Sequence, residues 1–244
     1  GSDTVFATAT VDNVTYRSNP VKVNWTTGLH TTSIDLNQSP TSGIAGTRAT
    51  LRATLIDVSL APAAAISGAS VHFAIGSQSC DAVTDATGVA TCGIVLPTVG
   101  SFTLSATYVG SALYRPASVS TDFQVIAPTS IDIDGNGSVD ALTDGMLIMR
   151  WLSGVSGPAL VNNGIGPNAT RVSADDVAAY LSALLPVLDV DLNSQSDSAT
   201  DGLLILRYLL GFRGDALTDN AVGAGAARSN AEDIAAYIQS LIPQ

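Results

Sequence analysis

Two short stretches in the C-terminal half carry side-chain oxygens at alternate positions, a pattern that suits a hard metal ion. In the first stretch Asp132, Asp134 and Asn136 alternate, and Asp144 follows at the thirteenth position. The same residue types recur 57 residues later, beginning at Asp189. Ca²⁺ takes six to eight oxygen ligands, and an alternating row lets one short loop wrap around an ion. The spacing therefore predicts one Ca²⁺ site in each stretch.

Each stretch offers a full set of oxygen ligands. Counting from the first Asp, we expect side-chain oxygens at positions 1, 3, 5, 9 and 13 and a backbone carbonyl at position 7, with the last carboxylate at the start of a helix. The predicted ligands are Asp132, Asp134, Asn136, Ser138, Asp140 and Asp144 in the first loop, and Asp189, Asp191, Asn193, Gln195, Asp197 and Asp201 in the second. Metal binding and folding should then be coupled, because clustered carboxylates repel one another when no ion is bound.

The alternative is that both rows are Asp-rich and Asn-rich turns that cap helices without metal. The second loop is the weaker metal site by this reasoning. It has Leu192 and Ser194 where the first has Gly135 and Gly137, and glycine eases the sharp turns of such a loop.

The loops belong to a duplicated unit that fills residues 128–244. Residues 132–186 are identical to residues 189–243 at 26 of 55 positions, so the repeats cover 131–186 and 188–243. The apolar pattern of each repeat predicts one buried helix after the loop and then one amphipathic helix that ends at a proline. The expected helices are Asp144–Leu152, Ala174–Leu185, Asp201–Leu210 and Ala231–Ile242, the second and fourth capped by Ser173 and Asn230. This predicts an all-α module of two EF-hand-like loop–helix repeats packed as a pseudo-two-fold pair.

Residues 29–127 read as a run of short strands separated by turn signals. The expected strands are Thr32–Leu36, Thr47–Asp57, Ala69–Ile75, Ser79–Thr84, Gly88–Leu96, Gly100–Tyr108 and Ser118–Ile126. Seven strands in about a hundred residues predict an antiparallel β-sandwich. A turn at residues 85–88 places Cys80 and Cys92 on opposite arms of one hairpin, where we expect a disulfide and hence an oxidising compartment. Two buried free thiols are the alternative.

Residues 1–28 predict two strands, Thr4–Val11 and Val21–Trp25, joined around Asp12 and Asn13. Two strands cannot bury a core by themselves. We therefore expect either the terminal hairpin of a preceding Ig-like domain or strands that dock on a neighbour, within the chain or between chains.

The net charge of −11 is concentrated in one half of the chain. Residues 129–244 hold fourteen acidic and five basic side chains, whereas residues 1–128 hold seven and five. This acidity argues against nucleic acid as a partner and suits a module that metal neutralises. No apolar run reaches the 18 residues that a membrane span requires.

Two resemblances follow from these motifs. Residues 31–127 resemble bacterial Ig-like repeats of surface and secreted proteins, on the segments 47–54, 78–92 and 100–108. Each thirteen-residue loop with its following helix resembles a dockerin type I module, which implies two Ca²⁺ ions and docking to cohesin domains. The whole 57-residue pattern resembles dockerin-like C-terminal repeats of large proteobacterial extracellular proteins.

The dockerin resemblance has three departures. The last carboxylate falls at position thirteen instead of twelve, and an extra capped helix lengthens each repeat. At the positions of the partner-reading pair, Ala141-Leu142 in one copy differs from Ser198-Ala199 in the other. The resemblance therefore implies calcium binding more strongly than cohesin binding.

These observations predict a non-catalytic extracellular module, secreted or on the bacterial cell surface. The Ig-like domain would serve as a spacer, and the Ca²⁺-binding module would give calcium-dependent stability and dock a cohesin-like or other extracellular protein. The alternative is a carbohydrate-binding or adhesion accessory region of a larger secreted enzyme, with a glycan as partner. No enzyme is expected: a metal-dependent hydrolase needs an open metal position beside a base, and the two histidines, His30 and His72, lie outside both loops.

Overall fold

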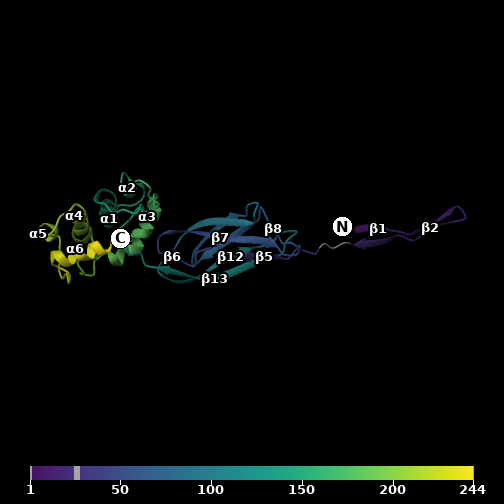
Figure 1. The fold of residues 1–244 in the computed structure, drawn as a ribbon, viewed down its shortest axis with the longest axis horizontal. Helices are drawn as coiled ribbons and strands as arrows, with labels where there is room; N and C mark the ends of the chain where they lie inside the picture. The colour runs from purple at the N-terminus through teal and green to yellow at the C-terminus, as the bar shows by residue number, and fades with distance from the viewer. Residues whose placement is uncertain (1, 25–27, 244) are drawn as a thin grey trace.

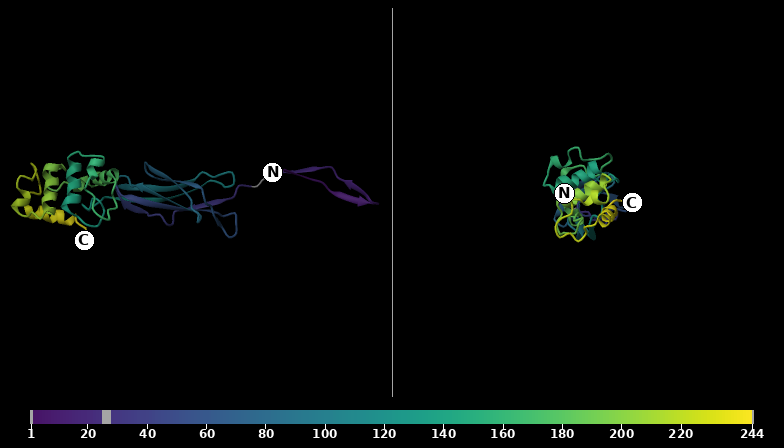
Figure 2. Two further views of the ribbon diagram at one scale, coloured as in Figure 1. Left: turned by 90° about the horizontal axis from the view of Figure 1, so that it is seen from above. Right: turned by 90° about the vertical axis from the view of Figure 1, so that its left-hand side faces the viewer.

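The computed structural model describes residues 2–24 and 28–243. Figure 1 shows three parts in a row: a β-hairpin, a β-sandwich and a group of short helices. The second view of Figure 2 looks along this row. We call them the N-terminal hairpin (residues 2–24), the sandwich (residues 29–126) and the helical module (residues 130–243). The expected β-sandwich is confirmed, and the helices that follow it are short.

The N-terminal hairpin contains four short strands. β1 (Ser2–Val5) pairs with β4 (Val21–Asn24), and β2 (Thr8–Val11) pairs with β3 (Val14–Arg17). Asp12 and Asn13 form the turn with φ values of 51° and 62°, a conformation that these two residue types tolerate. The first predicted strand is therefore interrupted, the strand β3 was missed, and Trp25 lies outside the described residues.

The sandwich consists of two facing sheets. The five-stranded sheet has the order β10 (Gln78–Val83), β9 (Ser70–Ile75), β12 (Gly100–Tyr108), β13 (Ala117–Ile126) and β6 (Ser42–Ile44), and only the β13–β6 pair is parallel. The other sheet has the order β11 (Val89–Val95), β7 (Arg48–Asp57) and β5 (Thr32–Asp35), with β8 (Ala64–Ala65) paired to β7. All seven predicted strands are present with slightly different ends; β6 and β8 are too short for the sequence pattern to reveal.

The core of the sandwich follows from alternation along its strands. In β7 every second side chain from Leu51 to Leu55 is buried, and these meet Phe73 and Phe123 of the opposite sheet. Successive strand residues point to opposite faces, so an alternating sequence covers one face of each sheet with apolar side chains. Burial of these faces holds the two sheets together.

Cys80 and Cys92 form the predicted disulfide, but the predicted hairpin around it is wrong. β10 pairs with β9 in one sheet, and β11 pairs with β7 in the other. The turn at residues 85–88 therefore carries the chain from sheet to sheet. The carbonyl of Gly88 accepts a hydrogen bond from Leu55 N at 2.9 Å, which joins the chain leaving the turn to β7. The disulfide thus links the two sheets.

The two repeats of the helical module have matching elements in the same order, except that a 3₁₀ turn follows the last helix of the first repeat. The first contains the π-helical turn η1 (Ala141–Gly145), α1 (Met146–Leu152), α2 (Pro158–Val161), α3 (Ala174–Leu184) and the 3₁₀ turn η2 (Leu185–Val187). The second contains η3 (Ser198–Gly202), α4 (Leu203–Leu209), α5 (Asp215–Thr218) and α6 (Ala231–Ser240). Ser173 and Asn230 cap α3 and α6 as predicted, each accepting from the backbone N–H three residues on. The short helices α2 and α5 were missed.

The two repeats pack reciprocally around one apolar core. A Cβ added to Gly145 would lie 3.1 Å from Leu206 Cδ1, and one added to Gly202 would lie 2.7 Å from Met149 Sδ. Gly145 and Gly202 are 57 positions apart, and so are Met149 and Leu206, so each repeat makes the same close contact with the other. This is the contact expected of a pseudo-two-fold pair.

The sandwich contacts the helical module through α3. Arg48 Nη2 lies 3.1 Å from Asp176 Oδ1, and a Cβ added to Gly46 would lie 2.5 Å from the Ala179 carbonyl oxygen. Ala183 packs against the core of the sandwich. The equivalent residues on α6 have no such partner in the described part of the chain, so only the first repeat forms the junction.

Candidate metal centres

Three carboxylates converge in the first loop (residues 132–144, loop 1). One oxygen each of Asp132, Asp134 and Asp144 lies within 4.8 Å of the other two. Asp134 and Asp144 are fully buried. In residues 2–24 and 28–243, no Lys, Arg or His side chain forms an ion pair with any of them. Buried carboxylates this close are stabilised by a neutralising partner, such as a proton or a divalent cation.

Backbone N–H groups hold the carboxylates of loop 1 in place. Asp144 Oδ1 accepts from Ile133 N at 2.6 Å, and Asp144 Oδ2 accepts from Asp140 N at 3.0 Å. The Asp132 carboxylate accepts from three N–H groups at 2.9 to 3.1 Å, those of Gly135, Asn136 and Gly137. The loop is therefore folded around its own acids, with the π-helical turn presenting Asp144 to the other two.

The structure places the other predicted ligands of loop 1 beside this cluster. Asn136 Oδ1 accepts from Ser138 N at 2.7 Å, and Asn136 Nδ2 lies 3.3 Å from Asp134 Oδ2. Asp140 Oδ1 caps the following helix by accepting from Leu142 N and Thr143 N, both at 3.1 Å. Positions 1, 3 and 13 are thus brought together, and the ligand roles of Asn136, Ser138 and Asp140 stay predictions.

The second loop (residues 189–201, loop 2) repeats this geometry. Asp189, Asp191 and Asp201 converge within the same 4.8 Å, and Asp201 Oδ1 accepts from Val190 N at 2.6 Å. Asn193 and Asp197 bond as Asn136 and Asp140 do, with Gln195 N donating to Asn193 Oδ1.

Loop 2 reaches this shape without the two glycines of loop 1. Leu192 and Ser194 adopt φ values of 57° and 70°, where Gly135 and Gly137 have 73° and 88°. A side chain makes this region unfavourable, so loop 2 is the more strained of the two. That loop 2 is the weaker metal site stays a prediction.

Burial raises the pKa of Asp144 to about 6, with the charge of Asp134 adding to the effect. The hydrogen bonds from the backbone of Asp140 and Ile133 act in the opposite direction and are outweighed. Burial also raises the pKa of Asp201. A bound cation favours the charged form of both carboxylates and removes the mutual repulsion.

Sequence reasoning missed two glycines that close the sites. Gly166 N donates to Asp134 Oδ2 at 2.6 Å, and Gly223 N donates to Asp191 Oδ2 at 2.6 Å. A Cβ on Gly166 would lie 2.9 Å from Asp134 Oδ2 and 2.5 Å from Asn136 Nδ2. The available signal was the recurrence of these glycines 57 residues apart, whereas the neighbouring Gly164 becomes Ala221.

Two arginines that the sequence analysis did not single out tie each loop to its second helix. The Arg171 guanidinium donates to the carbonyl oxygen of Ile133 at 2.7 Å and also to that of Asp132. It lies 3.9 Å from the centre of the Tyr180 ring. Tyr180 Oη in turn donates to Ser130 O at 2.8 Å. The second repeat uses Arg228 and Tyr237 in the same way. Loop 1 and the α3 helix therefore form one connected unit.

Other polar groups lie away from these centres. His72 Nδ1 lies 2.9 Å from Asp81 Oδ1 on the surface of the sandwich. Arg150 donates to the carbonyls of Leu160 and Asn162, so it closes the short helix α2. A largely apolar groove of about 490 Å³ lies at the junction, between residues 95–99 and the end of α3. None of the loop carboxylates lines it.

No helix in the described residues has the length and apolar character needed to cross a membrane.

Comparison with known proteins does not assign the chain to a family. No family model and no curated protein matches it. Parts of it are similar to solved structures. An endo-β-1,4-mannanase from Thermotoga petrophila has 12% identity and a TM-score of 0.28, over 41% of this chain and 20% of the mannanase. Domains 4 and 5 of the S-layer protein SbsC have 19% identity and a TM-score of 0.27, over 51% of this chain and 58% of that one; the D00–D0 domain of intimin has 20% identity and a TM-score of 0.26, over 50% of this chain and 64% of that one. This chain thus spans less than two thirds of each. TM-scores this low show neither a shared family nor a shared function, so the proposals below depend on the chain's own geometry.

Proposed function

We propose that the helical module binds two Ca²⁺ ions, one in loop 1 and one in loop 2. The observation that carries the proposal is the convergence of three carboxylates in each loop, none of which forms an ion pair with a basic side chain in residues 2–24 and 28–243. Their regular alternation also places the side-chain amides of Asn136 and Asn193 beside the cluster, where each amide nitrogen donates to a carboxylate oxygen. An all-oxygen donor set of this kind suits Ca²⁺, whereas zinc and copper sites are built from sulfur and imidazole ligands.

The protein is proposed to be a non-catalytic extracellular module, secreted or on a bacterial cell surface. The disulfide between the two sheets supports this location, since such bonds persist in oxidising compartments. In this account the sandwich is an Ig-like spacer. The helical module is a dockerin-like element that calcium stabilises.

Docking of an extracellular, cohesin-like protein is the role proposed for the helical module. Leu142 supports it: this side chain is largely exposed at the start of η1, within the pair where dockerins read their partner. Leu210 and Phe212 are further exposed apolar side chains of the module, in the turn after α4. Aromatic side chains such as that of Phe212 are enriched at the centres of protein interfaces.

Thermal unfolding with and without calcium tests the proposal. Excess EDTA should lower the Tm of the helical module and leave that of the sandwich unchanged, because only the former contains the carboxylate clusters. Asp144→Asn and Asp201→Asn should each remove part of the calcium-dependent gain, since Asn keeps the shape but loses the charge. A Tm that is the same in EDTA and in millimolar Ca²⁺ would refute calcium binding.

A further inference from the structure

One face of the N-terminal hairpin is apolar and exposed. The strand registers pair Val5 with Val21, Ala9 with Tyr16 and Val11 with Val14, so these residues share a side of the ribbon within each strand pair. The Asp3–Val23 pair at the end of the ribbon lies on the same side as Val5 and Val21. Tyr16 is 61% exposed and Val21 62%. The other side carries Thr4–Lys22, Thr8–Arg17 and Thr10–Thr15 pairs. A two-stranded ribbon with an uncovered apolar face is at best marginally stable.

The sequence of the hairpin matches the β12–β13 hairpin of the sandwich. Hairpin residues before the turn at Asp12 and Asn13 align with residues 99 positions later, and those after the turn align with residues 98 positions later. The identical pairs include Ser2 and Ser101, Thr4 and Thr103, Ala7 and Ala106, Thr8 and Thr107, Tyr16 and Tyr114, Arg17 and Arg115, and Val21 and Val119. Val5 also aligns with Leu104. The N-terminal hairpin therefore has the sequence of a last strand pair of a sandwich.

The sandwich shows what such a strand pair packs against. Leu104 and Ala106 are fully buried, and Val119 packs against the same core. Their counterparts Val5, Ala7 and Val21 have no opposite sheet in the described residues. The outer edge of β12 is also occupied, because Leu104–Thr107 pair with β9. The hairpin residues that match this edge are Val5–Thr8. In the described residues their backbone is paired only with the other arm of the hairpin, which contains β3 and β4.

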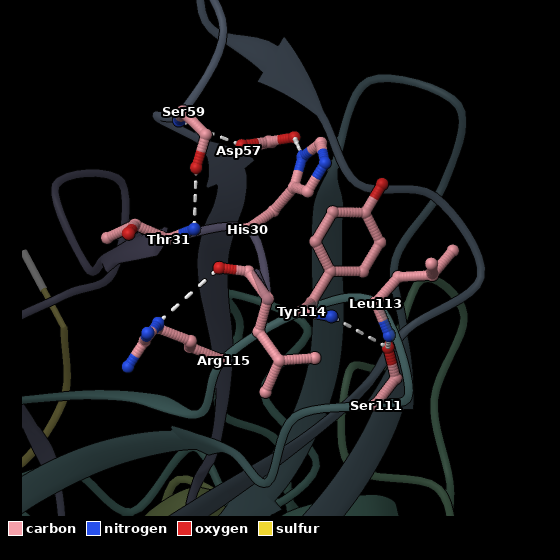
Figure 3. A network of polar contacts seen from close by, with 9 residues as sticks. His30, Thr31, Asp57, Ser59, Ser111, Leu113, Tyr114 and Arg115 are labelled. Atoms are coloured by element: carbon pink, nitrogen blue, oxygen red, sulfur yellow. Dashed lines mark hydrogen bonds and ion pairs between the residues drawn. The ribbon is translucent and has the colours of Figure 1, made fainter. Parts of the chain in front are cut away.

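The matched Tyr-Arg pair gives a second, independent comparison. In the sandwich, Tyr114 lies edge-on to His30 with ring centres 5.8 Å apart (Figure 3). Arg115 Nε donates to Leu29 O at 3.4 Å. Arg115 N also donates to His30 O at 2.9 Å, so the pair holds the segment that enters the sandwich. In the hairpin, Tyr16 is exposed and Arg17 lies over the Phe6 ring, 2.8 Å from its centre.

We propose that the N-terminal hairpin is a docking surface for the remainder of an Ig-like sandwich on the same polypeptide. The occupant has strands equivalent to β5, β7 and β11, which cover the apolar face, and a strand equivalent to β9, which pairs with the edge at Val5–Thr8. It also has an entering segment that Tyr16 and Arg17 hold. A second copy of this chain does not supply these strands, because its own β12 and β13 already fill that position. The proposal is independent of calcium.

Hydrogen exchange tests this by comparing the 244-residue chain with the full-length polypeptide that the proposal requires, in which the rest of a sandwich precedes residue 1. In the 244-residue chain we expect rapid exchange of the hairpin amides. In the full-length polypeptide we expect exchange at Val5–Thr8 and Val21–Val23 to be at least about 100-fold slower, because an amide in a packed sheet exchanges only when the sheet opens. Equal exchange in the two proteins would overturn the proposal.

Two further measurements separate the alternatives. Val21→Asp in the full-length polypeptide should abolish the slow exchange of the hairpin, whereas Thr10→Asp on the polar face should preserve it. The slow amides of the sandwich serve as the folding control in both variants. A dimer of the 244-residue chain with a protected hairpin would also overturn the proposal, in favour of pairing between copies.

Discussion

The backbone N–H of Gly166 donates to Asp134 Oδ2 at 2.6 Å across 32 residues of sequence. This contact brings the connection between the helices of the first repeat over the carboxylate cluster of loop 1. The same bond joins Gly223 and Asp191 in the second repeat. Each proposed metal site is therefore built by two separate segments of its repeat.

Replacing Gly166 by alanine should weaken calcium binding in loop 1. The added Cβ would enter the space held by Asp134 and Asn136, so both side chains must move. We expect about a tenfold or greater loss of affinity at one site, of the size seen when the outer shell of a metal site is disturbed. Isothermal titration calorimetry of the variant measures it.

Two matched variants control this prediction. Gly223→Ala should weaken the other site instead, and Gly28→Ala, which has open space around it, should weaken neither. Unchanged affinity at both sites in Gly166→Ala would show that the close approach has no part in binding.

The stability of the metal-free helical module should fall as pH rises. Asp144 has a pKa of about 6 in the folded chain and an ordinary value of 3.8, so between these values the folded state holds a proton that the unfolded state has lost. Stability from this group is complete below about pH 4 and is lost as pH rises through 6, by at most about 3 kcal/mol. Thermal unfolding in EDTA from pH 4 to 7 measures it.

Calcium should reverse this trend, because the ion binds the deprotonated carboxylate.

The sandwich provides an internal contrast. Burial of Asp57 alone would raise its pKa, but its hydrogen bonds with His30 and Ser59 outweigh burial and lower it. Asp57 therefore contributes stability above about pH 4 that is lost as pH falls. For the helical module, the Asp144→Asn variant is the control. If its stability in EDTA fell with rising pH as much as that of the parent protein, the assignment of the pH dependence to Asp144 would be contradicted.

Removal of the disulfide should destabilise the sandwich alone. Cys80 and Cys92 are twelve residues apart, and a loop of that length is worth about 3 kcal/mol in the chain-entropy account. The double variant Cys80→Ala, Cys92→Ala should unfold at lower urea, with the helical module unaffected. A midpoint unchanged from the parent would show that the bond between the sheets adds no stability.

Replacing Gly46 by alanine should open the junction between the sandwich and the helical module. Its Cβ would meet the backbone of α3 at Ala179, where no side chain can move aside. Gly68→Ala is the matched control, because Gly68 has the same φ of 75° and nothing within 4 Å of its Cβ position. Small-angle scattering should show a broader range of maximum dimensions for Gly46→Ala only. Equal scattering of the two variants would mean that the close contact does not fix the junction.

Much of this architecture follows from local sequence patterns. The alternation of Asp132, Asp134 and Asn136 located both loops through the 57-residue repeat, and Ser173 and Asn230 marked the starts of two helices. The strands of the sandwich were likewise visible in their alternation. These features depend on neighbours within a few residues, which a sequence displays directly.

The features that were missed depend on contacts distant in sequence. The turn at residues 85–88 is compatible with a hairpin and with a crossing between sheets, and the bond from Leu55 to Gly88 decides between them. Gly166 acts on Asp134 from another segment, so its role appears only in the fold. The helices α2 and α5 have four residues each, too few to show helical periodicity.

Calorimetric titration of the EDTA-stripped protein with Ca²⁺ decides whether the helical module binds calcium. We expect two binding events per chain, the weaker in loop 2, with the Tm of the helical module rising as each site fills. The Asp144→Asn and Asp201→Asn variants should each lose one event. A titration without binding heat, together with an unchanged Tm, would contradict the account and leave the two Asp rows as turns that cap helices.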